Sequence, residues 1–268
     1  MLLPTAHQTE SAIGDIIGGA RAWRFWTLLG WSDIRQRYRR SAFGPFWITI
    51  SMGLMTAALG VIYGSIFKMQ LADYMAYLAA GITAWLFFSS TLSEAASAFI
   101  GAEGIIKQCS IPLSVHIYRA IWRNLIVFAH NAVVLVVVFI FLGNIPLINP
   151  LALLVGLVLV SANLFVGSLL VATLCTRFRD IPPLISSVMQ LLFFVTPILF
   201  APAQLPPQLK LIASFNPVYH LIDVLRRPMI GELASVESYI FAVVLLMVVS
   251  ALCALLFFRF RPRIAYWL

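Results

Sequence analysis

Hydrophobic residues in this chain are gathered into long runs separated by short polar segments. The first run, residues 46–67, has no charge over 22 positions, and at about 1.5 Å per residue a helix of that length crosses a bilayer. Further runs cover residues 74–98, 118–142, 151–176, 184–201 and 238–258. The pattern predicts an all-α, polytopic membrane protein with six transmembrane helices at 46–258, within a single domain of residues 1–268.

The third and fourth runs form one uncharged stretch of 53 residues at 124–176, which is about twice the length of one span. Glycine, asparagine and proline residues between positions 143 and 150 divide it. We therefore expect a helical hairpin whose turn lies at these residues.

A cationic amphipathic segment at residues 20–42 precedes the first span. Its large apolar residues fall in one stripe about 140° wide on a helical wheel, made of Trp23, Trp26, Trp31, Ile34 and Tyr38. We expect a cytoplasmic interfacial helix with its aromatic rings toward the acyl boundary and its arginines at anionic headgroups. Ser41, Gly44 and Pro45 would form the corner into the first span. Residues 1–19 are polar and predict either a frayed tail or a short surface helix.

The segment of some 36 residues before the last span is not a simple polar loop. Residues 201–217 are rich in proline but carry apolar side chains, and residues 218–231 are amphipathic. Irregular backbone enters a bilayer only where protein or a water-filled cavity shields it. We expect short re-entrant helices around a pathway, with Lys210 and Asp223 facing water; the alternative is an external loop packed on the spans. Candidate external gate residues are Leu209, Ile212 and Leu221.

Composition supports a chain whose apolar surface faces lipid. The mean hydropathy is +0.97, and 62% of the 268 residues are apolar while 10% are charged, which is outside the usual range of soluble domains. The first 20 residues lack the continuous apolar core of a signal peptide, so we expect the first span to stay as an anchor. Cys109, Cys175 and Cys253 are widely spaced and odd in number, which favours packing roles over disulfides or a metal site.

The formal net charge of +8 reflects membrane topology and gives no reason to expect a nucleic-acid partner. Fourteen of the 18 lysines and arginines lie beside one face of the predicted bundle. The remaining four are Lys68, Lys210, Arg226 and Arg227. Positive residues gather on the cytoplasmic side of membrane proteins. We therefore expect both termini, including the tail at residues 259–268, in the cytoplasm.

Few residues in the chain have the chemistry of an enzyme or a proton-coupled carrier. Glu94 either faces the bundle interior or reaches the cytoplasmic end of its span, and His130 is typical of a neutral packing residue. The acids of the opposite face are scattered, whereas a membrane-bound glycosyltransferase or acyltransferase needs a clustered site. The chain has no GxxxxGK[ST] motif, so any ATP hydrolysis must come from a partner.

Several segments, in this order and spacing, resemble the membrane subunit of ABC-2 type exporters of surface polysaccharide, the family of O-antigen, capsule and teichoic-acid permeases. They are RQRYRRSAFGPFW at 35–47, the segment from GIIK to a proline at 104–112, TRFRDIPPL at 176–184, FFVTPILF at 193–200 and FNPVYHLIDVLR at 215–226. The resemblance implies a homodimer with two copies of a separate ATPase, which binds ATP and Mg. It also implies export of a lipid-linked glycan across the bacterial inner membrane, with no cofactor bound by this chain. The closest rival is an ABC-2 permease for a drug or a lipid.

The resemblance also implies roles for two groups of residues. Residues 102–110 would be a coupling helix docked in a cleft of the ATPase, although an ordinary loop is the alternative; its contacts would come from Glu103, Gly104, Ile105, Ile106 and Lys107. The second group would contact the pyrophosphate of a lipid-linked substrate, and consists of Arg35, Arg39 and Arg40. Orientation of the first span and binding of anionic lipid also explain arginines at this place.

Aromatic residues of the second and fifth predicted spans are candidates for lining a pathway. Their flat rings would stack on sugars without demanding a particular hydroxyl pattern, while the alternative places them in the core or against lipid. These candidates are Trp85, Phe88, Phe193 and Phe194.

Overall fold

The computed structural model describes residues 6–37, 39, 46–143 and 146–268. Within these ranges the chain is helical and contains no strand. The longer helices are α1 (Ala6–Arg21), α2 (Trp23–Arg37), α3 (Phe46–Phe67), α4 (Leu71–Ala98), α6 (Ser114–Leu142), α7 (Pro150–Arg177), α8 (Ile181–Val195), α10 (Pro217–Met229) and α11 (Val236–Phe260). The shorter ones are η1 (Ile100–Ala102), α5 (Glu103–Gln108), η2 (Pro202–Gln204), α9 (Pro207–Ser214), η3 (Arg261–Arg263) and α12 (Ile264–Trp267).

Within the described ranges, the model has five helices that are long and apolar enough to cross a membrane, namely α3, α4, α6, α7 and α11. The prediction of an all-helical, multi-pass membrane protein is confirmed to that extent. The predicted fifth span at 184–201 corresponds to α8, which is apolar but ends at Val195 after 15 residues. A helix of 15 residues is about 22 Å long, whereas the hydrocarbon core is about 30 Å thick.

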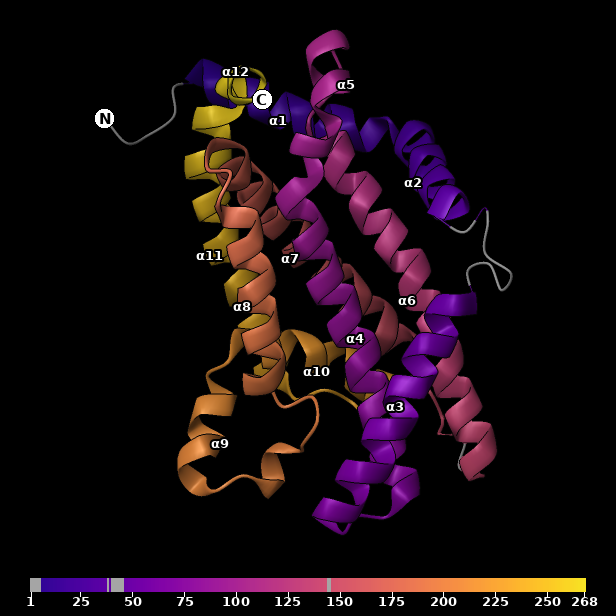
Figure 1. Cartoon of the computed structure of the whole chain (residues 1–268). Coiled ribbons are helices and arrows are strands. Elements are labelled where there is room, and N and C mark those ends of the chain that lie inside the picture. Colours follow the sequence, from indigo (N-terminus) through magenta and orange to yellow (C-terminus); the bar gives the residue numbers. More distant parts are fainter. Residues whose placement is uncertain (1–5, 38, 40–45, 144–145) are drawn as a thin grey trace.

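Helix α4 lies at the centre of the bundle and packs against α3, α6, α7, α8 and α10 (Figure 1). Its middle turn carries the small residues Ala79, Ala80 and Gly81, all of which are buried. Small residues let neighbouring helix backbones approach closely within a membrane. Aromatic and aliphatic side chains of the same helix, among them Tyr74 and Phe87, fill the main core between them.

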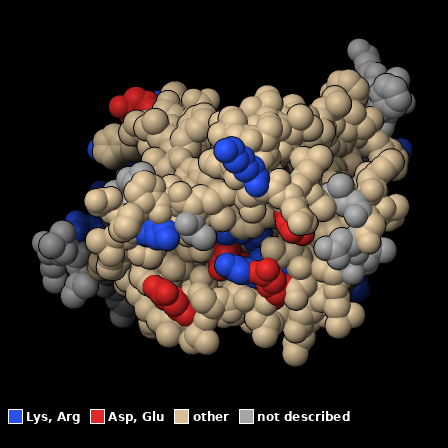
Figure 2. Space-filling view, turned by 90° about the horizontal axis from the view of Figure 1, so that it is seen from below, with Lys and Arg blue, Asp and Glu red and all other residues tan. Residues whose placement is uncertain are grey.

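The two ends of the bundle differ in charge. Helices α1, α2, α5 and α12 lie at one end, together with the C-terminus, and α9 and α10 lie at the other (Figure 1). Figure 2 shows the face on the side of α9 and α10, which is largely uncharged apart from a few charged side chains. The end that carries α1 and α12 holds the arginines of α1, α2 and η3, namely Arg21, Arg24, Arg35, Arg37, Arg261 and Arg263.

Asp15 of α1 caps the first turn of α6. Its carboxylate accepts hydrogen bonds from the backbone N–H groups of Leu113 and Ser114 at 3.0 and 2.9 Å, which satisfies amides that have no partner within the helix. Arg261 donates to the same carboxylate from Nε at 2.8 Å. Residues 6–19 are thus helical and join the N-terminal and C-terminal segments to α6.

Helix α2 lies against α6, and this contact covers some residues of the predicted apolar stripe and leaves others exposed. Trp26 stacks on Tyr118 and lies edge-on to Trp122; Ile34 is buried. Trp23 and Trp31 are exposed. The expectation that the whole stripe faces lipid is therefore wrong for Trp26, which packs on aromatic residues of α6, and for Ile34, which is buried. The predicted corner at Ser41, Gly44 and Pro45, and Tyr38 of the stripe, lie outside the described residues.

A glycine permits the close approach of α2 and α6. A Cβ added to Gly30 would lie 2.9 Å from the Trp122 side chain and 3.3 Å from the Arg119 carbonyl oxygen. A glycine also stands where the predicted hairpin turn begins, since Gly143 caps the end of α6 with a φ of 68°. Asn149 then caps α7 by accepting a hydrogen bond from Ala152 N–H at 3.0 Å.

After α8 the chain turns through residues 196–200, and carbonyl groups of this segment are bound by side chains of other helices. Tyr74 of α4 donates to the Leu199 carbonyl oxygen at 2.6 Å, and Arg226 of α10 donates to the Pro197 carbonyl oxygen at 2.8 Å. These bonds satisfy backbone groups that a continuing helix would have paired internally. Helix α8 ends at Val195, two residues before Pro197, because the residue before a proline is disfavoured in a helix.

Helix α10 is inserted among α4, α7 and α11, with most of its residues buried. The Cβ of an alanine at Gly156 of α7 would lie only 2.7 Å from the Val224 carbonyl oxygen, so this glycine allows α10 to seat. Asp223 is buried and forms an ion pair with Arg226. The expectation that Asp223 faces water is therefore wrong, because it neutralises an arginine inside the protein. Lys210 is exposed.

Candidate functional site

A groove of about 590 Å³ opens between α4 and α8 and is bordered by Met55 of α3. Its apolar part includes Trp85, Phe193 and Phe194. Its polar part consists of Ser89, Ser90, Ser93, Ser186 and Gln190. Residues spaced three or four apart share one helix face, and both Trp85 to Ser93 on α4 and Ser186 to Phe193 on α8 follow that spacing. The groove therefore combines aromatic rings with hydroxyl and amide groups.

The hydroxyl groups of α4 differ in whether they form hydrogen bonds within the protein. Thr83 and Thr91, which are buried, donate to the carbonyl oxygens four residues earlier at 2.8 and 2.6 Å. Among the described residues, Ser89 and Ser93 on the groove face have no hydrogen-bond partner within the protein. A hydroxyl both donates and accepts, so these serines are free to bind the polar groups of a molecule in the groove.

Three of the four predicted aromatic candidates border this groove. The rings of Trp85 and Phe193 have centroids 5.6 Å apart, and the side chain of Phe194 is 66% exposed. Phe88 is buried beside Trp85, with centroids 5.8 Å apart, and is not among the lining residues. The serines and Gln190 were not predicted as site residues, because only aromatic side chains were considered for the pathway. Their helical spacing from Trp85 and Phe193 is the signal that could have identified them.

At the opposite end from α9 and α10, the short helix α5 projects away from the bundle (Figure 1). Ile105 is 38% exposed, whereas Ile106 packs against the second hydrophobic cluster of the protein. Lys107 donates a hydrogen bond to Glu103 at 2.7 Å, and this bond holds the pKa of Glu103 below its ordinary value. A Cβ added to Gly104 would meet no atom within 4 Å. The five predicted coupling residues thus form one turn and a half of helix with an open outer face.

A cavity of about 470 Å³ lies beside α5. Its walls come from α1, from the chain between α5 and α6, and from the C-terminal segment, and include Ser11, Asp15, Cys109, Arg261 and Ala265. Asp15 and Arg261 are paired with each other at this place. The projecting helix and the cavity form one irregular surface, which is suited to docking of a partner protein.

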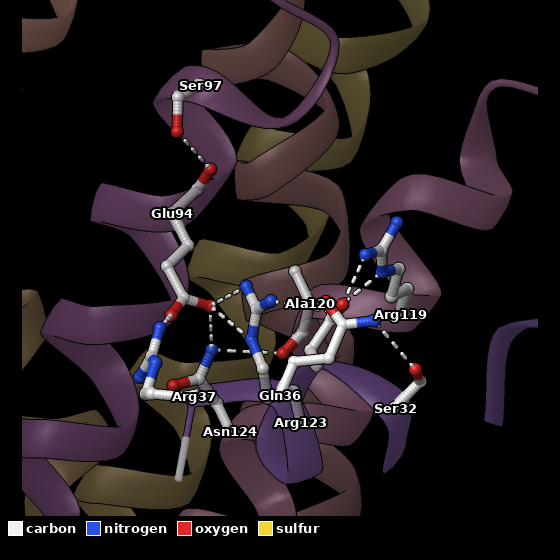
Figure 3. Close-up of polar contacts among 10 residues, drawn as sticks. Ser32, Gln36, Arg37, Glu94, Ser97, Arg119, Ala120, Arg123 and Asn124 are labelled. Carbon is white, nitrogen blue, oxygen red and sulfur yellow. Dashed lines mark hydrogen bonds and ion pairs between the residues drawn. The ribbon is translucent and has the colours of Figure 1, made fainter. Parts of the chain in front are cut away.

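A cluster of ion pairs joins α2, α4 and α6 below this surface (Figure 3). Asp33 of α2 accepts hydrogen bonds from Arg119 Nε at 2.7 Å and from Arg123 Nη1 at 2.8 Å. Glu94 of α4 accepts from Arg123 Nη2 at 2.6 Å and from Asn124 Nδ2 at 2.6 Å. Of the two positions considered for Glu94, the structure supports the one at the end of its span near α2. Arg123 lies between both carboxylates and couples the interfacial helix to the bundle.

The predicted arginine group is only partly described. Arg35 and Arg39 are exposed, while Arg40 lies outside the described residues. Arg37, one position away from the predicted set, approaches Glu94 with 3.6 Å between Nη2 and Oε1. Sequence reasoning missed Asp33, Arg119 and Arg123 as a cluster, because their pairing joins segments that are 86 to 90 positions apart.

The predicted external gate is also partly described. Leu221 is buried in the main core. Leu209 and Ile212 belong to α9, but their side chains lie outside what the structure describes.

Comparison with known proteins gives a family match over most of the chain. The family described as ABC-2 type transporter matches residues 24–230. An O-antigen export system permease protein RfbA of Klebsiella pneumoniae is 27% identical over 195 residues, which cover 71% of this chain and 74% of that protein. A second protein of that name from Klebsiella pneumoniae is 26% identical over 199 residues, and one from Myxococcus xanthus is 21% identical over 196 residues; each match covers 71% of this chain and 74% of the relative.

Proposed function

This chain belongs to the ABC-2 type transporter family, and on that premise we propose that it is the transmembrane subunit of an ATP-driven exporter for a lipid-linked polysaccharide of the O-antigen type. The groove between α4 and α8 is the observation that carries the proposal. Aromatic rings stack on the apolar faces of sugars, and unpaired hydroxyl groups exchange hydrogen bonds with sugar hydroxyls. A repeating polymer can slide past such a surface because no single contact is strong. The O-antigen export relatives support this substrate class.

The proposed transporter is a homodimer. The groove has walls from only three helices, α3, α4 and α8, so an enclosed pathway needs a second wall. A second copy of this chain supplies that wall when the two grooves face each other about a two-fold axis.

ATP hydrolysis is assigned to two copies of a separate ATPase, which hold the ATP and Mg. The chain has no phosphate-binding loop, and α5 offers the exposed Ile105 and the Glu103–Lys107 pair as a docking face. Helix α5 has six residues, and so short a helix has little stability of its own in water. Ile106 packs against the second hydrophobic cluster, so a displacement of α5 by the ATPase is transmitted to the bundle.

The proposed topology is a multi-pass protein of the bacterial inner membrane with both termini in the cytoplasm. The concentration of arginines at the end with α1, α2 and α12 supports this orientation. We assign the sixth crossing to α8 together with residues 196–200, and re-entrant positions to α9 and α10. Burial of α10 among α4, α7 and α11 supports its place within the membrane thickness.

Reconstitution with the cognate ATPase tests the proposal. Proteoliposomes that contain both proteins should move radiolabelled lipid-linked polysaccharide in an ATP-dependent manner, while this chain alone should hydrolyse no ATP above a mock preparation. Nucleotide turnover by the chain alone would contradict the proposal. Transport of a small amphipathic drug or of phospholipid, without transport of the glycan, would assign the chain to the rival class of ABC-2 permease.

A further inference from the structure

We propose that the pocket between α2, α4 and α6 binds the phosphate group of an anionic lipid headgroup. The pocket has a volume of about 310 Å³. The pocket is lined by Arg37, Arg119, Arg123 and His116, and also by Glu94 and Ser97. Figure 3 shows Arg123 between Arg37, which lies beside Glu94, and Arg119 on the other side.

Within the described residues, the charges of this cluster do not balance. Three guanidinium groups, of Arg37, Arg119 and Arg123, meet two carboxylates, of Asp33 and Glu94. Arg119 and Arg123 are held closely by hydrogen bonds to these acids. Arg37 is the loosest member, with a 3.6 Å ion pair and a side chain that is 54% exposed. The cluster keeps one positive charge in excess, and Arg37 is placed to turn toward an incoming anion.

His116 supplies an independent indication of a ligand. Its side chain lines the pocket and is 4% exposed. Its Nε2 atom is buried and has no hydrogen-bond partner among the described residues. Buried polar atoms in folded proteins nearly always have a partner. An oxygen of a phosphate group in the pocket would provide one.

The position of the pocket selects a lipid phosphate. It lies where α4 gives way to η1, at Ser97 to Ala102, and next to α2, whose Trp23 and Trp31 are exposed. Exposed tryptophans at the end of a span are typical of the membrane interface, which is the level of lipid phosphates. Two sources share this chemistry: a resident phospholipid and the phosphorylated lipid end of the exported molecule. Only the second source rests on the proposed function.

Native mass spectrometry of the full-length protein in detergent tests the site without any measurement of transport or ATPase activity. The probes are phosphatidylglycerol, a polyprenyl diphosphate and, as a lipid without net charge, phosphatidylcholine. Arg37→Gln should weaken binding of the anionic probes by about tenfold, which is the loss of one charge-assisted hydrogen bond. Arg37→Lys should recover part of that loss, and His116→Leu should also weaken binding. Arg24→Gln, which changes another exposed arginine of the same helix outside the pocket, is the matched control.

The two anionic probes separate the sources. Tenfold tighter binding of the polyprenyl diphosphate, sensitive to Arg37→Gln, supports the site with the exported molecule as its ligand. Equal binding of both probes with the same sensitivity supports the site with a resident phospholipid. Equal losses in Arg37→Gln and Arg24→Gln, or binding of phosphatidylcholine as strong as that of phosphatidylglycerol, would overturn the inference. Such a result would leave the exporter proposal intact, since the groove and α5 are separate from this pocket.

Discussion

Arg226 and Asp223 form an ion pair inside the protein, with 2.9 Å between Nη2 and Oδ1 and with side chains that are 0% and 2% exposed. The guanidinium also lies over the ring of Tyr77, with 4.1 Å between Cζ and the ring centroid, and donates to the Pro197 carbonyl oxygen. Arg226 of α10 thus contacts both α4 and the segment of residues 196–200 that follows α8. The Asp223–Arg226 pair therefore has a structural role inside the protein, at a position where Asp223 was expected to face water.

Removal of one partner of this pair should be strongly destabilising. Asp223→Ala leaves a buried guanidinium without its counter-charge, which costs about 3–5 kcal/mol. The thermal unfolding midpoint in detergent, followed by intrinsic fluorescence, should therefore fall by several degrees. The double variant Asp223→Leu with Arg226→Met should regain most of the loss, because apolar pairs of similar volume replace buried ion pairs with little penalty. Equal unfolding midpoints for Asp223→Ala and for the exposed-site control Lys210→Ala would contradict a structural role of the ion pair.

The seating of α10 on α7 should depend on Gly156. In Gly156→Ala the new Cβ would lie 2.7 Å from the Val224 carbonyl oxygen, and because that oxygen belongs to the backbone, α10 must shift. We expect a loss of about 1–3 kcal/mol from overpacking and faster proteolysis of the segment around α9. Gly14→Ala is the matched control, since a Cβ there meets nothing within 4 Å and alanine favours helix. Equal losses of stability in Gly156→Ala and Gly14→Ala would contradict a close contact between α7 and α10 at Gly156.

Ile105→Asp should break the association with the ATPase while the protein still inserts in the membrane. Ile105 is exposed and does not support the core, so its replacement should leave the unfolding midpoint unchanged. A carboxylate buried without a partner in the docked complex costs several kcal/mol. Co-purification with a tagged ATPase measures the effect, and Ile106→Asp serves for comparison, because Ile106 also packs on the bundle and should lower stability as well. Full recovery of the ATPase with Ile105→Asp would move the docking face away from α5.

Obstruction of the groove should stop export without loss of the complex. Ser89→Trp places a large ring among Trp85, Ser93 and Phe193, and we expect at least a tenfold fall in glycan transported by proteoliposomes, with the ATPase still bound. Leu154→Trp, on an exposed position of α7, is the control for adding the same ring elsewhere. Undiminished export by Ser89→Trp would exclude this groove as the pathway.

The native cysteines report topology without any substitution. Cys109 follows α5 and is exposed, whereas Cys175 and Cys253 are buried. An impermeant maleimide should label the protein in inside-out membrane vesicles and fail to do so in right-side-out vesicles. Cys109→Ser should abolish the labelling, and bound ATPase should slow it, because Cys109 lines the cavity beside α5. Labelling from the outside would reverse the proposed orientation.

The sequence predicts the elements whose limits are set by local chemistry. Helix α3 spans residues 46–67 as predicted, and α7 begins one residue before its predicted start because Asn149 and Pro150 provide a cap and a first turn. The early end of α8 has a local signal that the prediction of a span at 184–201 passed over, since Pro197 lies two residues after Val195 and the residue before a proline is disfavoured in a helix. The contacts that hold the following segment were not predictable in this way, because Tyr74 and Arg226 bind its carbonyl groups from other helices.

The same distinction applies to the candidate sites. The groove aromatics were selected by residue type on the second and fifth predicted spans, whereas Ile105 was selected through the resemblance to ABC-2 exporters. The cluster of Asp33 and Arg123 joins two segments 90 positions apart, and a charge count treats such residues as independent surface charges. Asp223 was expected to face water for that reason, since hydropathy assigns a cost to a buried carboxylate and does not show that Arg226 neutralises it.

The bond between Arg261 and Ser11 has a consequence for the order of events during synthesis. Arg261 Nη1 donates to Ser11 Oγ across 250 positions, next to the Asp15 carboxylate that holds the start of α6. At about 5–20 residues per second, the ribosome needs on the order of ten seconds or more to deliver this arginine after the first helix has emerged. Asp15 and Leu113 can meet earlier. The contact between Ser11 and Arg261 therefore forms only after helices α1 to α11 have been synthesised.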